Sequence, residues 1–266
     1  MAAPTRIDNR PRHTVADETL IDAPVDAVRA VILDVEGWTR LHPPAIHAEV
    51  LDEDESGRLI QYWSRAGENT VRTWRTRQRE GDEITFTHAP AQGAFASVRG
   101  GWTFEQRPGG STLVRMWHDF ELVAEDAGKP EQMAASMHRG ATEFLRTLKR
   151  GVENAASLTS RTVAYKEKLH IAGAVEDVYD FLADATARPE WMRVCLPHKA
   201  IVYKQGQPSD AIETQAGEWR FTAVPDGVVV TARHAATFHR HATDDGTFGA
   251  QVREFSRQAK RHVEGA

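Results

Sequence analysis

The stretch from Gly100 to Phe120 reads GGWTFEQRPGGSTLVRMWHDF, and it resembles a later stretch, Gly217 to Phe238, which reads GEWRFTAVPDGVVVTARHAATF. The aligned positions of the same residue type are Trp102 with Trp219, Pro108 with Pro225, and His118 with His234. Two copies of one pattern at a distance of more than 100 residues predict two domains of the same fold.

A second pair of segments repeats the passage from a strand into a helix. Its matched positions are Ile21, Val25, Asp26, Val28 and Ile32 with Ile171, Val175, Glu176, Val178 and Leu182. The offset is 150 residues here but 117 residues at the tryptophan pair, so the second copy is 33 residues shorter in its middle. We place the loss near Trp191 to Cys195. Either the second copy is shortened there, or the sequence represents it incompletely.

The composition agrees with a globular chain of two domains. A length of 266 residues exceeds the usual size of one compact domain, and we expect domains at residues 1–157 and 158–266, with the main cavity in the first. Hydrophobic residues make up 41% of the chain and charged residues 27%, which is enough apolar surface for cores. The formal charge of -5 lacks the basic surplus that nucleic-acid binding needs, so we expect no nucleic-acid partner.

The sequence also predicts the compartment. The segment from Met1 to Arg12 is polar, and no stretch approaches the ~20 apolar residues of a membrane span. The single cysteine, Cys195, excludes an internal disulfide and fits a reducing compartment. We therefore expect a cytoplasmic protein that has no membrane partner.

Local patterns in the first copy predict a strand, two helices, a run of strands and a long helix. A strand at residues 14–22 leads to a helix opened by Pro24, and a short helix at residues 38–42 stops before Pro43. Residues 46–122 alternate between short strands and turn residues, and an apolar stripe of helical spacing follows Pro130. This order predicts the α+β class, with an antiparallel sheet curved around the last helix.

Alternation along each strand predicts which side chains point to the buried face of that sheet. In the strand that ends at Leu122, the inner face carries Met116, His118 and Phe120. On the neighbouring strands the inner face carries Arg72, Trp74, Gln78 and Trp102, and the opposite face carries Arg75, Arg77 and Arg79. Large aromatic rings with a few polar groups are typical of a ligand cavity.

Four motifs together resemble a known family. They are GWTRLHPPAIHAEVL at residues 37–51, VRTWRTR at 71–77, GGWTFE at 100–105 and HDF at 118–120. The chain resembles the aromatase/cyclases of bacterial type II polyketide synthases, of the didomain kind associated with reducing systems. The resemblance covers nearly the whole chain except the shortened middle. It implies two tandem helix-grip domains of the START/Bet v 1-like superfamily.

The resemblance further implies a function. The inner cavity would take a poly-β-ketone, ketoreduced and tethered to an acyl carrier protein, direct the aldol closure of its first ring and help eliminate water. The other synthase components would be partners, and no cofactor is implied. Trp74 and Trp102 match the wall positions of the family, whereas Gln78 stands where an arginine is expected, which leaves that role to Arg72 or Arg77. The substrate-binding set is completed by Trp38, Met116 and Phe120.

The proposed chemistry needs a group that removes and returns protons, and histidine titrates near neutrality. His118 is therefore the candidate acid/base, and the alternative is a core histidine satisfied by a neighbour. Arg72 could stabilise an enolate oxygen or could be a sheet-edge arginine in solvent. Trp74 and Trp102 could be cavity walls or core. His234 and Trp219 are the second-copy counterparts.

The sequence contains no motif typical of a metal site, a nucleotide site or a catalytic serine. The chain has twelve histidines but no HExxH, and His239 and His241 lie two apart, so we expect no metal site. There is no GxSxG elbow, P-loop or dinucleotide fingerprint, so we expect no cofactor. The alternative function is a noncatalytic carrier for an apolar ligand, because the same cavity could bind without reaction. The arginines at 75, 77 and 79 form either a solvated face or a docking site for an acidic carrier protein.

Overall fold

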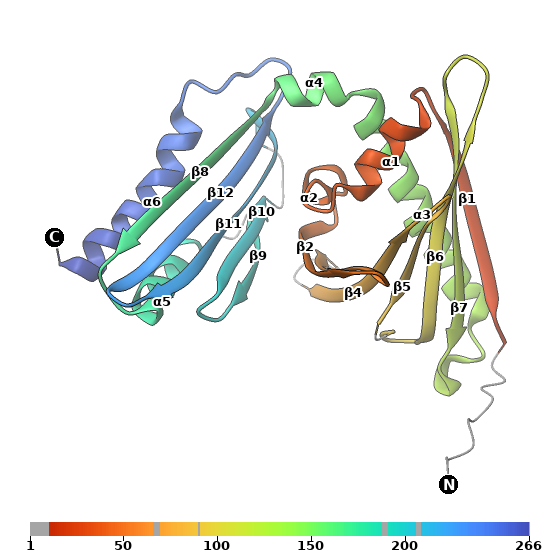
Figure 1. Ribbon diagram of the computed structural model, residues 1–266, viewed down its shortest axis with the longest axis horizontal. Helices are drawn as coiled ribbons and strands as arrows, with labels where there is room; N and C mark the ends of the chain where they lie inside the picture. Colours follow the sequence, from red (N-terminus) through yellow and green to blue (C-terminus); the bar gives the residue numbers. More distant parts are fainter. Residues whose placement is uncertain (1–10, 66–69, 90, 188–190, 206–208, 266) are drawn as a thin grey trace, which may run out of the picture. The chain divides into compact units, whose positions relative to one another are not determined.

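The computed structural model describes residues 11–65, 70–89, 91–187, 191–205 and 209–265. The first copy shows the predicted order of a strand, two helices, a run of strands and a long helix (Figure 1). Its elements are β1 (His13–Ile21), α1 (Val25–Leu33), α2 (Trp38–Leu41), β2 (Ala45–Asp54), β3 (Gly57–Arg65), β4 (Val71–Glu80), β5 (Ile84–His88), β6 (Phe95–Gln106), β7 (Thr112–Leu122), a 3-10 turn (Ala124–Asp126) and α3 (Pro130–Glu153).

The second copy repeats this order with fewer strands between its first helix and its last two strands. Its elements are α4 (Ala155–Ser160), β8 (Thr162–Ile171), α5 (Val175–Ala185), β9 (Trp191–Leu196), β10 (Ala200–Gln205), β11 (Ile212–Val224), β12 (Gly227–Phe238) and α6 (Thr247–Glu264). β9 spans the place where we expect the loss. The second sheet has five described strands and the first has seven, which agrees with a shorter middle in the second copy.

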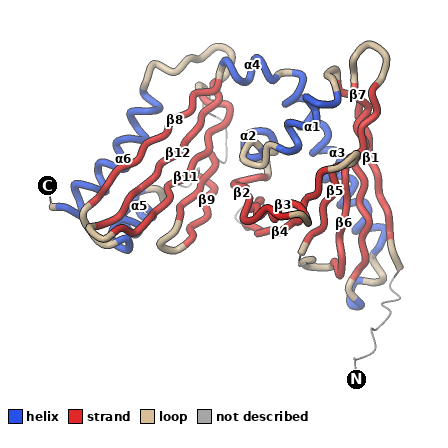
Figure 2. The backbone as a smooth tube through the Cα atoms, viewed as in Figure 1, coloured by secondary structure: helices blue, strands red, loops and turns tan. Residues whose placement is uncertain are grey.

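The described strands form two sheets (Figure 2). The antiparallel pairs are β1–β7, β4–β5, β5–β6, β6–β7, β8–β12, β9–β10, β10–β11 and β11–β12. The first sheet has the order β1-β7-β6-β5-β4-β3-β2 and the second has the order β8-β12-β11-β10-β9. In each sheet the first strand of the copy pairs with the last strand of the copy. The long helix packs on these two strands: α3 contacts β1 and β7, and α6 contacts β8 and β12. The predicted α+β class is confirmed.

Packing divides the chain into two compact units that do not follow the sequence halves. The first unit contains Met1–Val35, Glu49–Gln61 and Trp74–Glu153, and the second contains Glu36–Ala48, Tyr62–Thr73 and Asn154–Ala266. Within the second unit, the Lys204 ammonium donates hydrogen bonds of 3.0 Å to the backbone carbonyls of residues 42, 43 and 45. The boundary between residues 157 and 158 stays a prediction.

The helices begin where the sequence predicts. Pro24 is the N-cap of α1, with extended backbone angles, and Asp26 lies in the first turn, where a negative charge favours the helix dipole. α1 buries Val28 and Ile32, which repeat at helical spacing. None of the helices in the described part of the chain is both long and apolar enough to cross a membrane.

The alternation predicted for β7 is confirmed by burial. Its buried side chains are Thr112, Val114, Met116, His118, Phe120 and Leu122, and the residues between them are more exposed. The inner face of β7 packs under α3 in two groups. Phe120 and Leu122 lie against the start of the helix near Met133 and Met137, while Val114 and Met116 belong to the core cluster that includes Leu145 and Leu148.

Candidate active site

His118 lies on the inner face of β7, in a row of residues that crosses three strands. Gly100 on β6 is the register partner of His118, and Phe86 on β5 is the register partner of Gly100. A Cβ atom at Gly100 would lie 2.5 Å from the Phe86 Cζ atom. The missing side chain therefore lets the Phe86 ring reach across β6, and the centroids of the Phe86 and His118 rings are 5.5 Å apart.

Phe86 is the centre of an aromatic group. Its ring centroid lies 5.1 Å from that of Trp102 and 5.3 Å from that of His88. Trp74, at the outer end of the group, has its centroid 5.2 Å from that of His88. Tilted and edge-on arrangements at these separations are the favourable ones for aromatic pairs. The face thus combines flat apolar rings with two imidazoles.

Three buried polar atoms on this face have no hydrogen-bond partner among the described residues. They are His118 Nδ1, Gln78 Nε2 and Trp102 Nε1. All three belong to side chains around Phe86, because Gln78 is its register partner on β4 and the rings of His118 and Trp102 contact it. Buried polar groups are nearly always paired, so unpaired ones indicate a bound molecule or water. Two N–H donors, one from an amide and one from an indole, lie beside an imidazole and suit a ligand rich in carbonyl oxygens.

Burial controls the charge of both imidazoles. It lowers the pKa of His118 to about 4, and the Asp17 carboxylate opposes part of that effect. Burial also lowers the pKa of His88 to about 4, helped by repulsion from His118 and opposed by a backbone hydrogen bond at Arg75. Both rings are therefore neutral at pH 7 and able to accept a proton. Asp17 is held near α3, 2.8 Å from His138 Nδ1.

These pKa values predict an acid-sensitive fold. Between pH 6.5 and pH 4, His118 and His88 are protonated in the unfolded chain but stay neutral in the folded chain. The free energy of unfolding should therefore fall as pH drops. The expected loss is up to about 1.4 kcal/mol per pH unit for each histidine. Urea unfolding of the wild type and of His118→Gln at pH 7 and pH 5 measures it. Equal pH dependence of the two proteins would show that His118 is not buried in its neutral form.

One predicted site residue is corrected. Arg72 is exposed and does not lie among the buried inner residues. The reason is its position at the start of β4: the pairing of β4 with β5 begins only at Thr76, and the strand is exposed over its first three residues. The alternative of a solvent-exposed arginine is the correct one.

The arginine that does reach the inner polar group is Arg58 on β3. Its guanidinium donates 2.5 Å to Gln78 Oε1 and 3.1 Å to the Leu33 carbonyl. Gln78 is almost completely buried, with 2% of its surface exposed. Arg77, the other arginine we considered, lies away from this group and donates to Asp54 and to the turn that follows it.

The remaining predicted residues occupy different surroundings. Trp74 is half-buried beside His88, Met116 is buried next to Trp102, and Phe120 is completely buried under α3. Trp38 belongs to the second unit, where its ring centroid is 6.0 Å from that of Tyr62. The roles assigned to these residues stay predictions.

The arginines on the outer face of β4 form hydrogen bonds with residues of the same sheet and of the turn between β2 and β3. Arg75 donates to Gln61 at 2.8 Å and Arg79 donates to the Ser56 carbonyl at 2.7 Å. With Arg77 bound to Asp54, all three arginines have intramolecular partners. This favours the solvated face over a carrier-protein docking site.

Sequence reasoning missed Phe86, His88, Arg58 and Asp17. The first two could have been found, because Ile84, Phe86 and His88 alternate in the segment ITFTH as inner residues do. Arg58 gives no such signal, since its partner Gln78 lies on another strand. Among the described residues, no group of three or more His, Cys, Asp or Glu side chains could hold a metal ion.

The second copy places His234 and Trp219 as the repeat predicts. His234 lies on β12 opposite Gly217 on β11, which repeats the pair of His118 and Gly100. Trp219 is completely buried, and its ring centroid lies 4.4 Å from that of His234. Burial lowers the pKa of His234 to about 3.

Known proteins resemble the chain over most of its length. It is 22% identical to the granaticin polyketide synthase bifunctional cyclase/dehydratase of Streptomyces violaceoruber, over 88% of this chain and 83% of that protein. It is 25% identical to the actinorhodin polyketide synthase bifunctional cyclase/dehydratase of Streptomyces coelicolor, over 84% of this chain and 83% of that protein.

Solved structures share the architecture. The di-domain ARO/CYC StfQ from the steffimycin biosynthetic pathway matches with a TM-score of 0.76 and 26% identity, over 94% of this chain and 98% of that one. The di-domain ARO/CYC BexL from the BE-7585A pathway matches in fold, with a TM-score of 0.72 and 22% identity, over 93% of each chain.

A family model described as polyketide cyclase / dehydrase and lipid transport matches residues 12–153. That range is more than half of the chain, and it contains the aromatic group around Phe86 together with His118. The chain therefore belongs to the polyketide cyclase/dehydrase and lipid transport family.

Proposed function

We propose that the protein is a cyclase/dehydratase of a type II polyketide synthase, and that the inner face of the first copy closes and dehydrates the first ring of its substrate. The observation that carries this proposal is the group of unpaired buried polar atoms, His118 Nδ1, Gln78 Nε2 and Trp102 Nε1, around an aromatic centre. Family membership and the likeness to the two Streptomyces cyclase/dehydratases support it.

The substrate we propose is a poly-β-ketone bound to an acyl carrier protein and reduced at one ketone. The other synthase components and the carrier protein are the partners, and the reaction takes place in the cytoplasm. Such a chain carries carbonyl oxygens at alternate carbons. Trp102 Nε1 and the Gln78 amide can donate to these oxygens, while the rings of Phe86 and Trp74 provide flat surfaces for the folded chain.

Ring closure begins with proton removal. Neutral His118 takes a proton from a methylene that lies between two carbonyls, and the C–H electron pair becomes an enolate. The enolate carbon attacks a distant ketone carbon, which forms the new C–C bond and leaves an alkoxide. The alkoxide takes the proton back from the His118 imidazolium and becomes a hydroxyl.

Loss of water uses the same group in the same two roles. His118 removes a proton from the ring carbon next to the hydroxyl-bearing carbon, the C=C bond forms, and the C–O bond breaks. The imidazolium then protonates the departing oxygen, so one water leaves and the histidine is again neutral. Hydrogen bonds from Gln78 and Trp102 to the neighbouring carbonyl oxygen would stabilise the enolate in both steps.

Reconstitution with a purified minimal polyketide synthase and its ketoreductase tests the proposal. Adding this protein is expected to shift the products from spontaneously cyclised compounds to one with an aromatised first ring, detected by liquid chromatography and mass spectrometry. An unchanged set of products, combined with measurable binding of the polyketide, would instead identify a noncatalytic carrier.

A further inference from the structure

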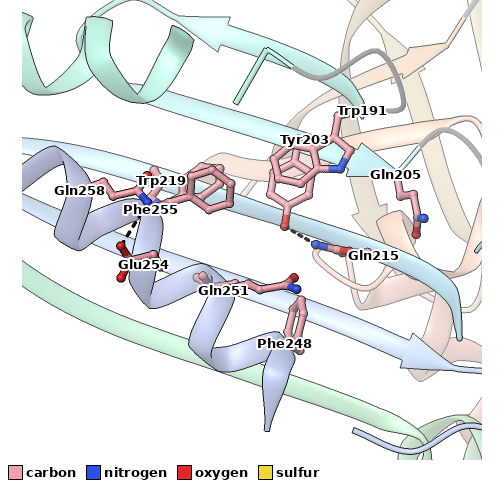
Figure 3. Close-up of a pocket in the computed structure, with 11 residues that line it drawn as sticks. Trp191, Tyr203, Gln205, Gln215, Trp219, Phe248, Gln251, Glu254, Phe255 and Gln258 are labelled. Atoms are coloured by element: carbon pink, nitrogen blue, oxygen red, sulfur yellow. Dashed lines mark hydrogen bonds between the residues drawn. The ribbon is translucent and has the colours of Figure 1, made fainter. Parts of the chain in front are cut away.

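The second copy contains a pocket of about 410 Å³ between the inner face of its sheet and α6 (Figure 3). Its aromatic walls are Trp191 from β9, Tyr203 from β10, Trp219 from β11, and Phe248 and Phe255 from α6. All these residues belong to one compact unit. The volume lies in the range of small-molecule sites.

The aromatic walls of the pocket suit a flat ligand. The rings of Trp191 and Tyr203 are stacked, with centroids 4.1 Å apart and planes inclined by 13°. Tyr203 and Trp219 are also stacked at 5.5 Å, and the Phe255 ring meets Trp219 edge-on at 5.9 Å. Flat rings arranged in this way favour an aromatic or conjugated molecule over a branched aliphatic one.

Most of the polar lining residues are uncharged. Glutamines contribute most of it, namely Gln205, Gln215, Gln251 and Gln258. Glu254, the one charged residue in the described lining, accepts hydrogen bonds from Arg261 at 2.5 Å and from Gln258 at 3.1 Å. The described lining includes no lysine, arginine or histidine. A neutral ligand therefore fits better than an anion or a cation.

Two polar atoms in this lining are buried and have no hydrogen-bond partner among the described residues: Trp219 Nε1, a donor, and Gln205 Oε1, an acceptor. A ligand oxygen can accept from Trp219, and a hydroxyl hydrogen can be donated to Gln205.

Tyr203 is held in the pocket by a hydrogen-bonded chain. The Gln215 amide donates to the Tyr203 hydroxyl at 3.0 Å (Figure 3). That hydroxyl lies 3.1 Å from His234 Nδ1. Gly217 makes this chain possible, because it lies between Tyr203 and His234 in the strand register and a Cβ atom there would be 2.0 Å from His234 Nδ1.

The first copy has the same arrangement without the hydroxyl. Phe86, Gly100 and His118 occupy successive strands in the register that Tyr203, Gly217 and His234 occupy in the second copy. The second copy thus repeats the aromatic–glycine–histidine row of the first and adds a phenol to it. This repeat points to a ligand site and not only to a filled core.

We propose that the second copy holds its own ligand site, which takes a neutral, flat, conjugated ring compound that carries a hydroxyl or carbonyl oxygen. Tyr203 and Trp219 contact that oxygen, while Gln215, His234 and Gly217 are positioning residues for Tyr203. The proposal does not depend on the reaction assigned to the first copy.

The test uses the full chain labelled with 5-fluorotryptophan and 19F NMR, because each of the seven tryptophans then reports its own surroundings. The probes are 2-naphthol and naphthalene, which differ only in the hydroxyl. We expect 2-naphthol to shift the Trp191 and Trp219 resonances in a saturable way, and to bind about fivefold more tightly than naphthalene. Shifts confined to the Trp74 and Trp102 resonances, or none up to the solubility limit, would overturn the proposal.

The matched variants are Tyr203→Phe and Tyr179→Phe, since Tyr179 is a buried tyrosine of the same copy that does not line the pocket. Tyr203→Phe should bring the dissociation constants of the two probes within about twofold of each other. Tyr179→Phe should keep the preference for 2-naphthol. If Tyr203→Phe fails to fold, Gln215→Leu replaces it and should weaken the preference in the same direction. A preference retained in the folded variant at the pocket contradicts the assignment of Tyr203.

Discussion

Replacement of His118 by alanine is expected to lower the rate of formation of the aromatised product by about 100-fold or more, the usual contribution of a positioned acid or base. The ring is buried, its Nδ1 has no partner among the described residues, and burial keeps it neutral at pH 7. Its removal takes away the base for both proposed steps. The measurement is product formation in the reconstituted synthase, with urea unfolding to show that the variant is folded.

His118→Asn separates proton transfer from positioning. The amide keeps part of the shape and can form hydrogen bonds, but it cannot take up and return a proton as an imidazole does, so its rate should resemble that of alanine. Near-normal activity of His118→Asn would mean that His118 orients the chain without moving protons. Near-normal activity of both variants would transfer the proton-moving role to another group, and His88 is then the next residue to replace.

Phe120→Ala is expected to lower the free energy of unfolding by about 3–5 kcal/mol. We predicted Phe120 as a substrate-binding residue, and the structure places its ring completely buried between β7 and α3. The Phe95 ring meets it edge-on at 5.6 Å and the His13 ring stacks on it at 5.2 Å. Removing the ring therefore leaves a cavity in a packed group. Chemical denaturation at pH 7 measures the loss.

Phe120→Leu is the control for this prediction. Leucine keeps most of the apolar volume, so its destabilisation should be clearly smaller than that of alanine. The activity of the folded fraction should stay close to wild type in both variants if Phe120 only packs. A Phe120→Ala protein with wild-type stability and a large loss of activity would show instead that the ring contacts substrate.

Local sequence patterns predicted the order of elements and the inner face of β7. The reason is that side chains alternate between the two faces of a strand and return to the same face of a helix every 3.6 residues. Both periods can therefore be recognised from residues close together in the sequence. The inward direction of His118 followed from the strand period, and the helix start followed from Pro24, a residue that favours the beginning of a helix. The repeat of Trp102 at Trp219 and of His118 at His234 predicted the second copy in the same way.

The same reasoning was wrong for Arg72. Alternation predicts which face of a strand a side chain lies on, but it does not predict how far along the strand that face is buried. Arg72 stands on the correct face of β4 and outside the covered part of the strand. The inner arginine is Arg58, and its bond to Gln78 joins residues 20 positions apart in the chain. Strand pairing decides which residues meet at that distance, and no local pattern encodes it.

By itself, therefore, the sequence determined the two copies, because the repeat can be read by aligning the chain with itself. It also determined the element order and the side chains that turn inward, because these depend on residues close together in the chain. The register between strands was decided only by the tertiary structure. It places Gly100 between Phe86 and His118, and Gly217 between Tyr203 and His234. A glycine has no side chain to keep its cross-strand neighbours apart, so each histidine meets an aromatic ring only when three strands are aligned.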